Sequence, residues 1–258
     1  MGSIQLSWLG MSLLVASPIL GGLLVMAVKP HLAGPLKMLL TFCGGFLFAT
    51  AVLHLLPEVF ATQHHYEGLL ILVGFFLQML LEKFSEGVEH GHLHLDGHEG
   101  HDHGPHDHSH FHKHGLSFGL LLSLSIHSLV EGIPLNGSFS LDLPFWQNPL
   151  LFGVIIHKFP SAFALMTVLQ QSALSKAKRL GMLFFFAAMT PLGVLIGHYI
   201  LGAQTAANNE TFHILLALAT GSFLQIATTI LFESTVNHQF SARAILLAFA
   251  GTLVAFAL

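Results

Sequence analysis

The chain alternates long apolar segments with short polar connections. Eight segments are apolar over about 20 residues, the length that a helix needs to cross the hydrocarbon core of a bilayer. They cover residues 6–28, 36–60, 66–84, 116–135, 149–171, 180–202, 211–234 and 241–258. This pattern predicts an all-α membrane protein with eight transmembrane helices that contact the lipid bilayer.

The composition excludes several other classes of protein. Only 9% of the 258 residues are charged, whereas a soluble domain carries about a quarter. The nine Lys and Arg residues form no cluster, so no nucleic-acid partner is expected. The single cysteine, Cys43, has no second cysteine in the chain with which to form a disulfide.

The basic residues predict the orientation of the helices, because Lys and Arg gather in cytoplasmic loops. Eight of the nine fall in the connections after the first, third, fifth and seventh apolar segments. These are Lys29, Lys37, Lys83, Lys113, Lys176, Lys178, Arg179 and Arg243. We therefore expect both termini to lie outside the cytoplasm, in a plasma membrane or a bacterial inner membrane.

One connection differs from the others in composition. Residues 85–115 hold 11 His and six Asp or Glu, too few apolar residues to form a core, so this loop is expected to be disordered and cytoplasmic. His-rich tracts are typical of metal binding, although a solvated acidic linker is an alternative. The histidines are His90, His92, His94, His98, His101, His103, His106, His108, His110, His112 and His114.

The loop also divides the chain into parts. The predicted divisions are spans one to three over 1–84, the loop over 85–115, spans four and five over 116–171, and spans six to eight over 172–258.

Ionisable residues in the middle of two apolar segments predict a metal site. His127 and Glu131 are four residues apart, so on a helix they lie one turn apart on the same face. His157 lies near the middle of the next segment. Ionisable groups at membrane depth are costly and usually functional, and His nitrogen and Glu oxygen are ordinary Zn²⁺ ligands. The alternative is an interhelical hydrogen bond that only holds two helices together.

Further polar residues lie nearer the two membrane surfaces. His54 and Glu58 are expected at the outer end of an ion route, and Glu82, Glu233 and His238 at the cytoplasmic end. Any one of them taken alone is more often an ordinary interfacial residue than a ligand.

Several of these motifs resemble those of the ZIP (Zrt-, Irt-like protein) family of divalent-metal transporters. The similar stretches are HLLPE at 54–58, HSLVEG at 127–132 and HKFPSA at 157–162. The resemblance implies a 3+2+3 bundle, in which spans one to three and six to eight are inverted repeats around spans four and five. It also implies metal uptake toward the cytoplasm by sliding of one bundle against the other, often in homodimers.

The chain departs from the family pattern at a second metal position. The resemblance implies two adjacent metals bridged by carboxylates, but Ser128 replaces the usual Asn, Lys158 and Ser161 replace metal ligands, and Thr190 replaces a Glu. We therefore expect one ion, bound by His127, Glu131 and His157. The ammonium of Lys158 would stand in for the second cation, and Ser128, Ser161 and Thr190 would be weaker contributors.

The predicted function is import of a divalent metal. Two imidazoles and one carboxylate favour Zn²⁺ over the harder Mn²⁺, and Fe²⁺, Mn²⁺ and Cd²⁺ stay open as alternative substrates. Two other protein classes also stay open: a membrane sensor that binds metal without transporting it, and an exporter of the cation-diffusion type. An enzyme is not expected, because the chain has no His-Glu-x-x-His helix.

Overall fold

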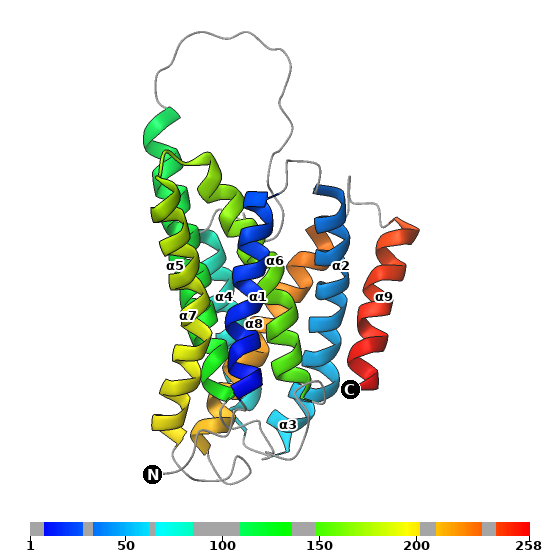
Figure 1. The fold of residues 1–258 in the computed structure, drawn as a ribbon. Helices are drawn as coiled ribbons and strands as arrows, with labels where there is room; N and C mark the ends of the chain where they lie inside the picture. Colours follow the sequence, from blue (N-terminus) through cyan, green and yellow to red (C-terminus); the bar gives the residue numbers. More distant parts are fainter. Residues whose placement is uncertain are drawn as a thin grey trace.

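The computed structural model describes residues 8–27, 33–61, 65–84, 109–135, 148–201, 210–233 and 241–258. Within these ranges the chain is helical and contains no strand, so the predicted all-α class is confirmed (Figure 1). The helices are α1 (Trp8–Ala27), α2 (Ala33–Thr50), α3 (Leu56–Phe60), α4 (Glu67–Phe84), α5 (Ser109–Leu135), α6 (Pro149–Gln171), α7 (Lys176–Leu201), α8 (Glu210–Glu233) and α9 (Ala242–Ala257). A π-helical turn, Ala51–Leu55, joins α2 to α3.

Each predicted apolar segment corresponds to a helix, and the ends differ most at α5. This helix begins at Ser109 rather than at 116, so helix extends into the segment that we expected to be disordered. Between Ser109 and His114 there is neither Pro nor Gly to stop a helix from continuing beyond the apolar span. The rest of the His-rich loop, from His90 to His108, and His238 lie outside the described residues.

Six spans are long and apolar enough to cross a membrane: α1, α2 with α3, α5, α6, α7 and α8. The other two long helices differ for simple reasons. Helix α4 carries Glu67, Glu82 and Lys83 within its 18 residues, and α9 has only 16 residues. Both nevertheless expose large apolar side chains, such as Phe76 on α4 and Phe249 on α9. That each of them crosses the bilayer stays a prediction.

The long helices pack in two groups of four. In the first, α5 lies along α7, while α1 lies along both α6 and α7. In the second, α4 lies along α8, while α2 lies along both α8 and α9. We call α1, α5, α6 and α7 the ligand unit, and α2, α4, α8 and α9 the support unit. Contacts between the two units are fewer and run mainly from α2 to α6, from α4 to α5 and from α5 to α8.

Glycines allow the closest helix pairs to approach backbone to backbone, as is common in membrane proteins. Between α5 and α7, a Cβ on Gly132 would collide with the carbonyl oxygen of Thr190, and one on Gly193 with that of Leu129. In the support unit, Gly74 and Gly221 likewise allow close backbone contact between α4 and α8. These contacts fix the distance between the helices and hence the position of α5 in the bundle.

A methyl group at Gly193 should therefore destabilise the fold. In Gly193→Ala the new Cβ would overlap the Leu129 carbonyl oxygen and force α5 away from α7. We expect the free energy of unfolding, measured by denaturant titration in detergent micelles, to fall by about 1–3 kcal/mol. The matched control is Gly181→Ala on α7, where a Cβ meets nothing within 4 Å. Equal stability of both variants would contradict this account of the α5–α7 contact.

Candidate metal site

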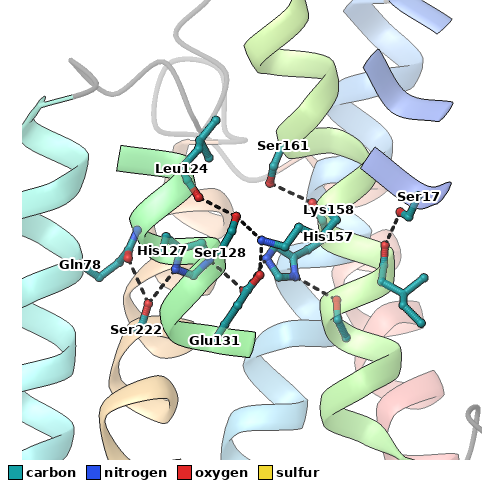
Figure 2. A network of polar contacts seen from close by, with 12 residues as sticks. Ser17, Gln78, Leu124, His127, Ser128, Glu131, His157, Lys158, Ser161 and Ser222 are labelled. Carbon is teal, nitrogen blue, oxygen red and sulfur yellow. Dashed lines mark hydrogen bonds and ion pairs between the residues drawn. The ribbon is translucent and has the colours of Figure 1, made fainter. Parts of the chain in front are cut away.

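Two imidazoles and a carboxylate meet between α5 and α6, where these helices face α8 of the support unit (Figure 2). Helix α5 supplies His127 and Glu131, which lie one turn apart on one face, and α6 supplies His157. Glu131 Oε2 lies 3.0 Å from His127 Nε2 and 3.1 Å from His157 Nε2. Each of the three side chains is at most 4% exposed. Their ligand atoms all lie within 4.8 Å of one another, and no other group of this kind occurs among the described residues.

The distances within this cluster are close to those of a metal site and are also those of an imidazole–carboxylate hydrogen bond. Both Nε2 atoms are buried, and both lie against the same atom, Oε2 of Glu131. A tetrahedral Zn²⁺ with bonds of about 2.0–2.2 Å separates its ligand atoms by roughly 3.3–3.6 Å. A small outward movement of the two rings would therefore admit an ion between the three atoms.

The other nitrogen of each imidazole is held by the protein. His157 Nδ1 donates to the carbonyl oxygen of Gly153, one turn earlier on α6, at 3.0 Å. Because a carbonyl can only accept, Nδ1 of His157 carries a proton, and in the neutral ring the Nε2 lone pair faces Glu131. His127 Nδ1 lies 3.2 Å from Ser222 Oγ on α8. Such outer contacts are usual for metal-binding histidines.

Lys158 contacts the other oxygen of the Glu131 carboxylate, Oε1. Its ammonium forms an ion pair with Glu131 Oε1 and donates a hydrogen bond to Ser128 Oγ, which in turn donates to the Leu124 carbonyl oxygen at 2.5 Å. The Lys158 side chain is 2% exposed, and its Nζ lies 5.2 Å from the centre of the Phe186 ring. Glu131 therefore faces the ammonium with one oxygen and the imidazoles with the other.

The weaker candidate ligands have other partners or lie at the margin. Ser128 contacts Lys158, as described, and Ser161 Oγ donates to the His157 carbonyl oxygen at 2.9 Å. Thr190 is buried on α7 and outside the three-residue cluster. A cavity of about 10 Å³, which is roughly the size of one water molecule, adjoins both imidazoles. Its lining consists of Leu40, Cys43, Leu124, His127, His157, Pro160, Ser161, Ile226 and Ile230.

The predicted route residues lie away from the cluster. His54 Nε2 is 2.7 Å from the Ala255 carbonyl oxygen of α9, and Glu58 is exposed on α3. At the opposite end of the bundle, Glu82 on α4 accepts a hydrogen bond from the Gln225 amide of α8. Glu233 is the last residue of α8. The structure therefore places these residues toward the two ends of the helices and joins none of them to the three-residue cluster.

Sequence reasoning did not identify Gln78 and Ser222 as parts of the site. Both are buried, and Ser222 Oγ donates to Gln78 Oε1 at 3.1 Å. The available signal was an amide at Gln78 inside the apolar segment of α4, four residues before Glu82. Ser222 gave no comparable signal, because a single serine in an apolar helix is common.

Removing only the carboxylate should destabilise the protein strongly. Glu131→Leu would leave the Lys158 ammonium buried without its counter-charge. We expect the free energy of unfolding to fall by about 3–5 kcal/mol, whereas Glu131→Leu with Lys158→Met should recover most of this loss. Denaturant titration of both variants in detergent tests the ion pair. A double variant no more stable than the single one would show that the charge pair is not the cause.

Comparison with known proteins shows which family the chain belongs to. The family model described as ZIP zinc transporter matches residues 85–258. The chain is 26% identical over 220 residues to the zinc transporter ZIP1 of Danio rerio, covering 72% of this chain and 71% of that protein. It is 28% identical over 224 residues to the zinc transporter ZIP1 of Takifugu rubripes, covering 74% and 73%. With its apolar helices and this match over most of its length, the chain is a multi-pass membrane protein that belongs to the ZIP zinc transporter family.

Proposed function

We propose that this protein carries a divalent metal, with Zn²⁺ as the preferred substrate, across the membrane toward the cytoplasm. The observation that carries the proposal is the buried group of His127, Glu131 and His157, whose ligand atoms lie within 4.8 Å of one another. The relatives named as zinc transporters support zinc as the substrate. Membership of a transporter family is also consistent with the expectation that the protein is not an enzyme.

The proposed ion lies near the middle of the membrane. His127 is close to the centre of the apolar span Phe118–Leu135, and His157 lies in the middle part of Pro149–Gln171. An ion there has lost its hydration shell, and three protein ligands replace part of it. The fourth position would be filled by water, or by Ser161 after its hydroxyl turns away from the His157 carbonyl, because Ser161 lines the small adjoining cavity.

We propose that the site holds one ion rather than two. The one carboxylate of the cluster divides its oxygens between the imidazoles and the ammonium of Lys158. A second divalent ion on the Lys158 side would meet a positive charge instead of a ligand, because a protonated amine has no lone pair to offer. The single negative charge of Glu131 faces three positive charges, two on the ion and one on Lys158, and this weakens the binding of the ion and favours its release into the cytoplasm.

The packing of the helices supports the proposed inverted repeats. If the first three spans exchange with the last three, α1 exchanges with α7, α2 with α8 and α4 with α9, while α5 exchanges with α6. Under this exchange, the contact between α1 and α6 corresponds to the contact between α7 and α5. The contact between α2 and α9 likewise corresponds to the contact between α8 and α4. All four are the most extensive contacts among the described helices. The 3+2+3 arrangement is therefore the proposed topology.

Release on the cytoplasmic side is supported by the position of the cavity. Leu124 precedes His127 on α5, while Pro160 and Ser161 follow His157 on α6. The cavity therefore extends from the imidazoles toward the end of the bundle at which α4 ends and α5 begins, which are the helices that flank residues 85–108. The basic residues predict that this end is cytoplasmic. Outer termini, a cytoplasmic His-rich loop and a homodimer stay predictions.

Uptake of ⁶⁵Zn²⁺ into proteoliposomes tests the function. We expect uptake by a protein that lacks residues 90–108, a deletion that ends before α5 begins at Ser109 and so keeps this helix intact. His127→Gln should lower the rate at least about tenfold, because it removes one of three ligands and leaves the Glu131–Lys158 ion pair in place. Protein-free vesicles set the background.

A second candidate function is metal sensing without transport, and the buried Lys158 ammonium beside the site favours it. The same experiment separates the two. Zinc binding that depends on His127, without flux above the background, would favour the sensor and overturn the transporter.

The charge of Lys158 should control how many ions bind. We expect one Zn²⁺ per loop-deleted chain, measured by isothermal titration and native mass spectrometry. Lys158→Glu should raise the number to two, because it places a second carboxylate where the ammonium lies. Lys178→Glu, on the exposed first turn of α7, makes the same charge change far from the site and should leave the number at one. If the unaltered protein bound two ions, the proposal that the Lys158 ammonium takes the place of a second metal ion would be refuted.

A further inference from the structure

The imidazole of His127 makes a hydrogen bond with a residue of another helix. Its Nδ1 atom lies 3.2 Å from Ser222 Oγ on α8, and Ser222 Oγ donates to Gln78 Oε1 on α4 at 3.1 Å. In Figure 2, Ser222 connects Gln78 to His127, which is a member of the three-residue cluster. All are buried, with Gln78 2% and Ser222 7% exposed.

The direction of these hydrogen bonds places a proton on Nδ1 of His127. The amide oxygen of Gln78 can only accept, so the single hydroxyl proton of Ser222 points toward it. Ser222 Oγ then has only lone pairs left for His127, and Nδ1 must donate. A neutral imidazole with its proton on Nδ1 carries a lone pair on Nε2. This Nε2 is the atom 3.0 Å from Glu131 Oε2.

The two imidazoles reach the same state by different means. His157 donates to the carbonyl oxygen of Gly153 on its own helix, so α6 alone sets its tautomer. His127 depends on an acceptor from the support unit. If the hydrogen bond between Gln78 and Ser222 were lost, the Ser222 hydroxyl could turn and donate to Nδ1. The imidazole proton would then move to Nε2 and block the ligand atom.

We propose that Gln78 and Ser222 are positioning residues, which hold His127 in the tautomer that can bind the metal. The inference rests on the proposed function, since it concerns the same site. Neither residue belongs to the group that would touch the ion. They act through the imidazole, as outer partners of metal-binding histidines do.

The hydrogen bond of His127 also crosses between the two units of the bundle. Ser17 with Ile155 and Gln170 with Val25 are hydrogen bonds within the ligand unit. Tyr66 with Glu210 joins the ends of α4 and α8, within the support unit. Ser222 with His127 joins the support unit to a ligand of the ion. The affinity for metal therefore depends on the support unit being in register with α5.

The tautomer of His127 can be measured without any metal. In the metal-free, loop-deleted protein at pH 8, ¹⁵N NMR of labelled histidines distinguishes Nδ1–H from Nε2–H, and the His127 signals are those lost in His127→Gln. We expect Nδ1–H in the unaltered protein. Gln78→Leu should shift the proton toward Nε2, whereas Gln78→Glu keeps an acceptor for Ser222 and should keep Nδ1–H. A residue that only fills space would not move this signal.

Zinc affinity provides the second measurement. Gln78→Leu and Ser222→Val should raise the Kd for Zn²⁺ about 10–100-fold, the usual effect of losing an outer partner of a metal ligand. Ser222→Thr has the shape of Ser222→Val but keeps the hydroxyl, so its Kd should stay within a few-fold of the unaltered protein. The double variant of Gln78→Leu with Ser222→Val should bind no more weakly than Gln78→Leu alone, because no hydroxyl remains to stabilise the wrong tautomer.

Three results would overturn the proposal. They are an Nε2–H proton on His127 in the unaltered metal-free protein, an unchanged tautomer and Kd in Gln78→Leu, and an equal rise in Kd for Ser222→Thr and Ser222→Val. The first needs no variant and so does not depend on how well the variants fold. Failure of the proposed function would instead be seen in the uptake experiment, as no zinc uptake by the protein with His127 intact. In that case the NMR measurement still tests the roles of Gln78 and Ser222.

Discussion

Lys158 and Glu131 bring opposite charges together where neither can reach water, since their side chains are 2% and 1% exposed. Removing ions of this kind from water costs several kcal/mol each, and their attraction offsets the cost only with good geometry and further hydrogen bonds. Ser128 supplies one such hydrogen bond to the ammonium. Glu131 is thereby kept as a carboxylate inside an apolar bundle, and its second oxygen stays available to the imidazoles. Without this pair the site would lack its negative charge.

The ion pair in turn requires α5 and α6 to lie at a fixed separation. The glycine contacts between α5 and α7 hold α5 from one side, and α1 packs along both α6 and α7. A change of about an ångström in this packing would separate Glu131 from His157, which lie on different helices and are 3.1 Å apart. Small residues at helix contacts therefore serve the proposed metal site as well as the fold, because they fix the distances between the three clustered side chains.

The sequence predicted the helices and the three residues that meet in the cluster, because both leave local patterns. Apolar length marks a membrane helix, and His127 with Glu131 repeats at one turn. The parts that it did not predict depend on contacts between distant segments. Ser222 meets His127 across 95 residues and Gln78 across 144, and no local period encodes either contact. The early start of α5 was missed for another reason: composition predicts disorder from the lack of apolar residues, whereas a helix already formed in the membrane can continue into polar residues.

The division of the site between two units bears on how a bound ion could be released. All three proposed ligands and Lys158 belong to the ligand unit, so a movement of this unit as a whole leaves the distances between the ligand atoms unchanged. The contact of His127 with Ser222 would not survive such a movement, because its two partners lie on different units. A shift of even one or two ångströms would leave His127 Nδ1 without its acceptor and would weaken the hold of Nε2 on the ion. If the units slide as the resemblance to the family implies, a displacement that breaks this contact would also lower the affinity for the ion.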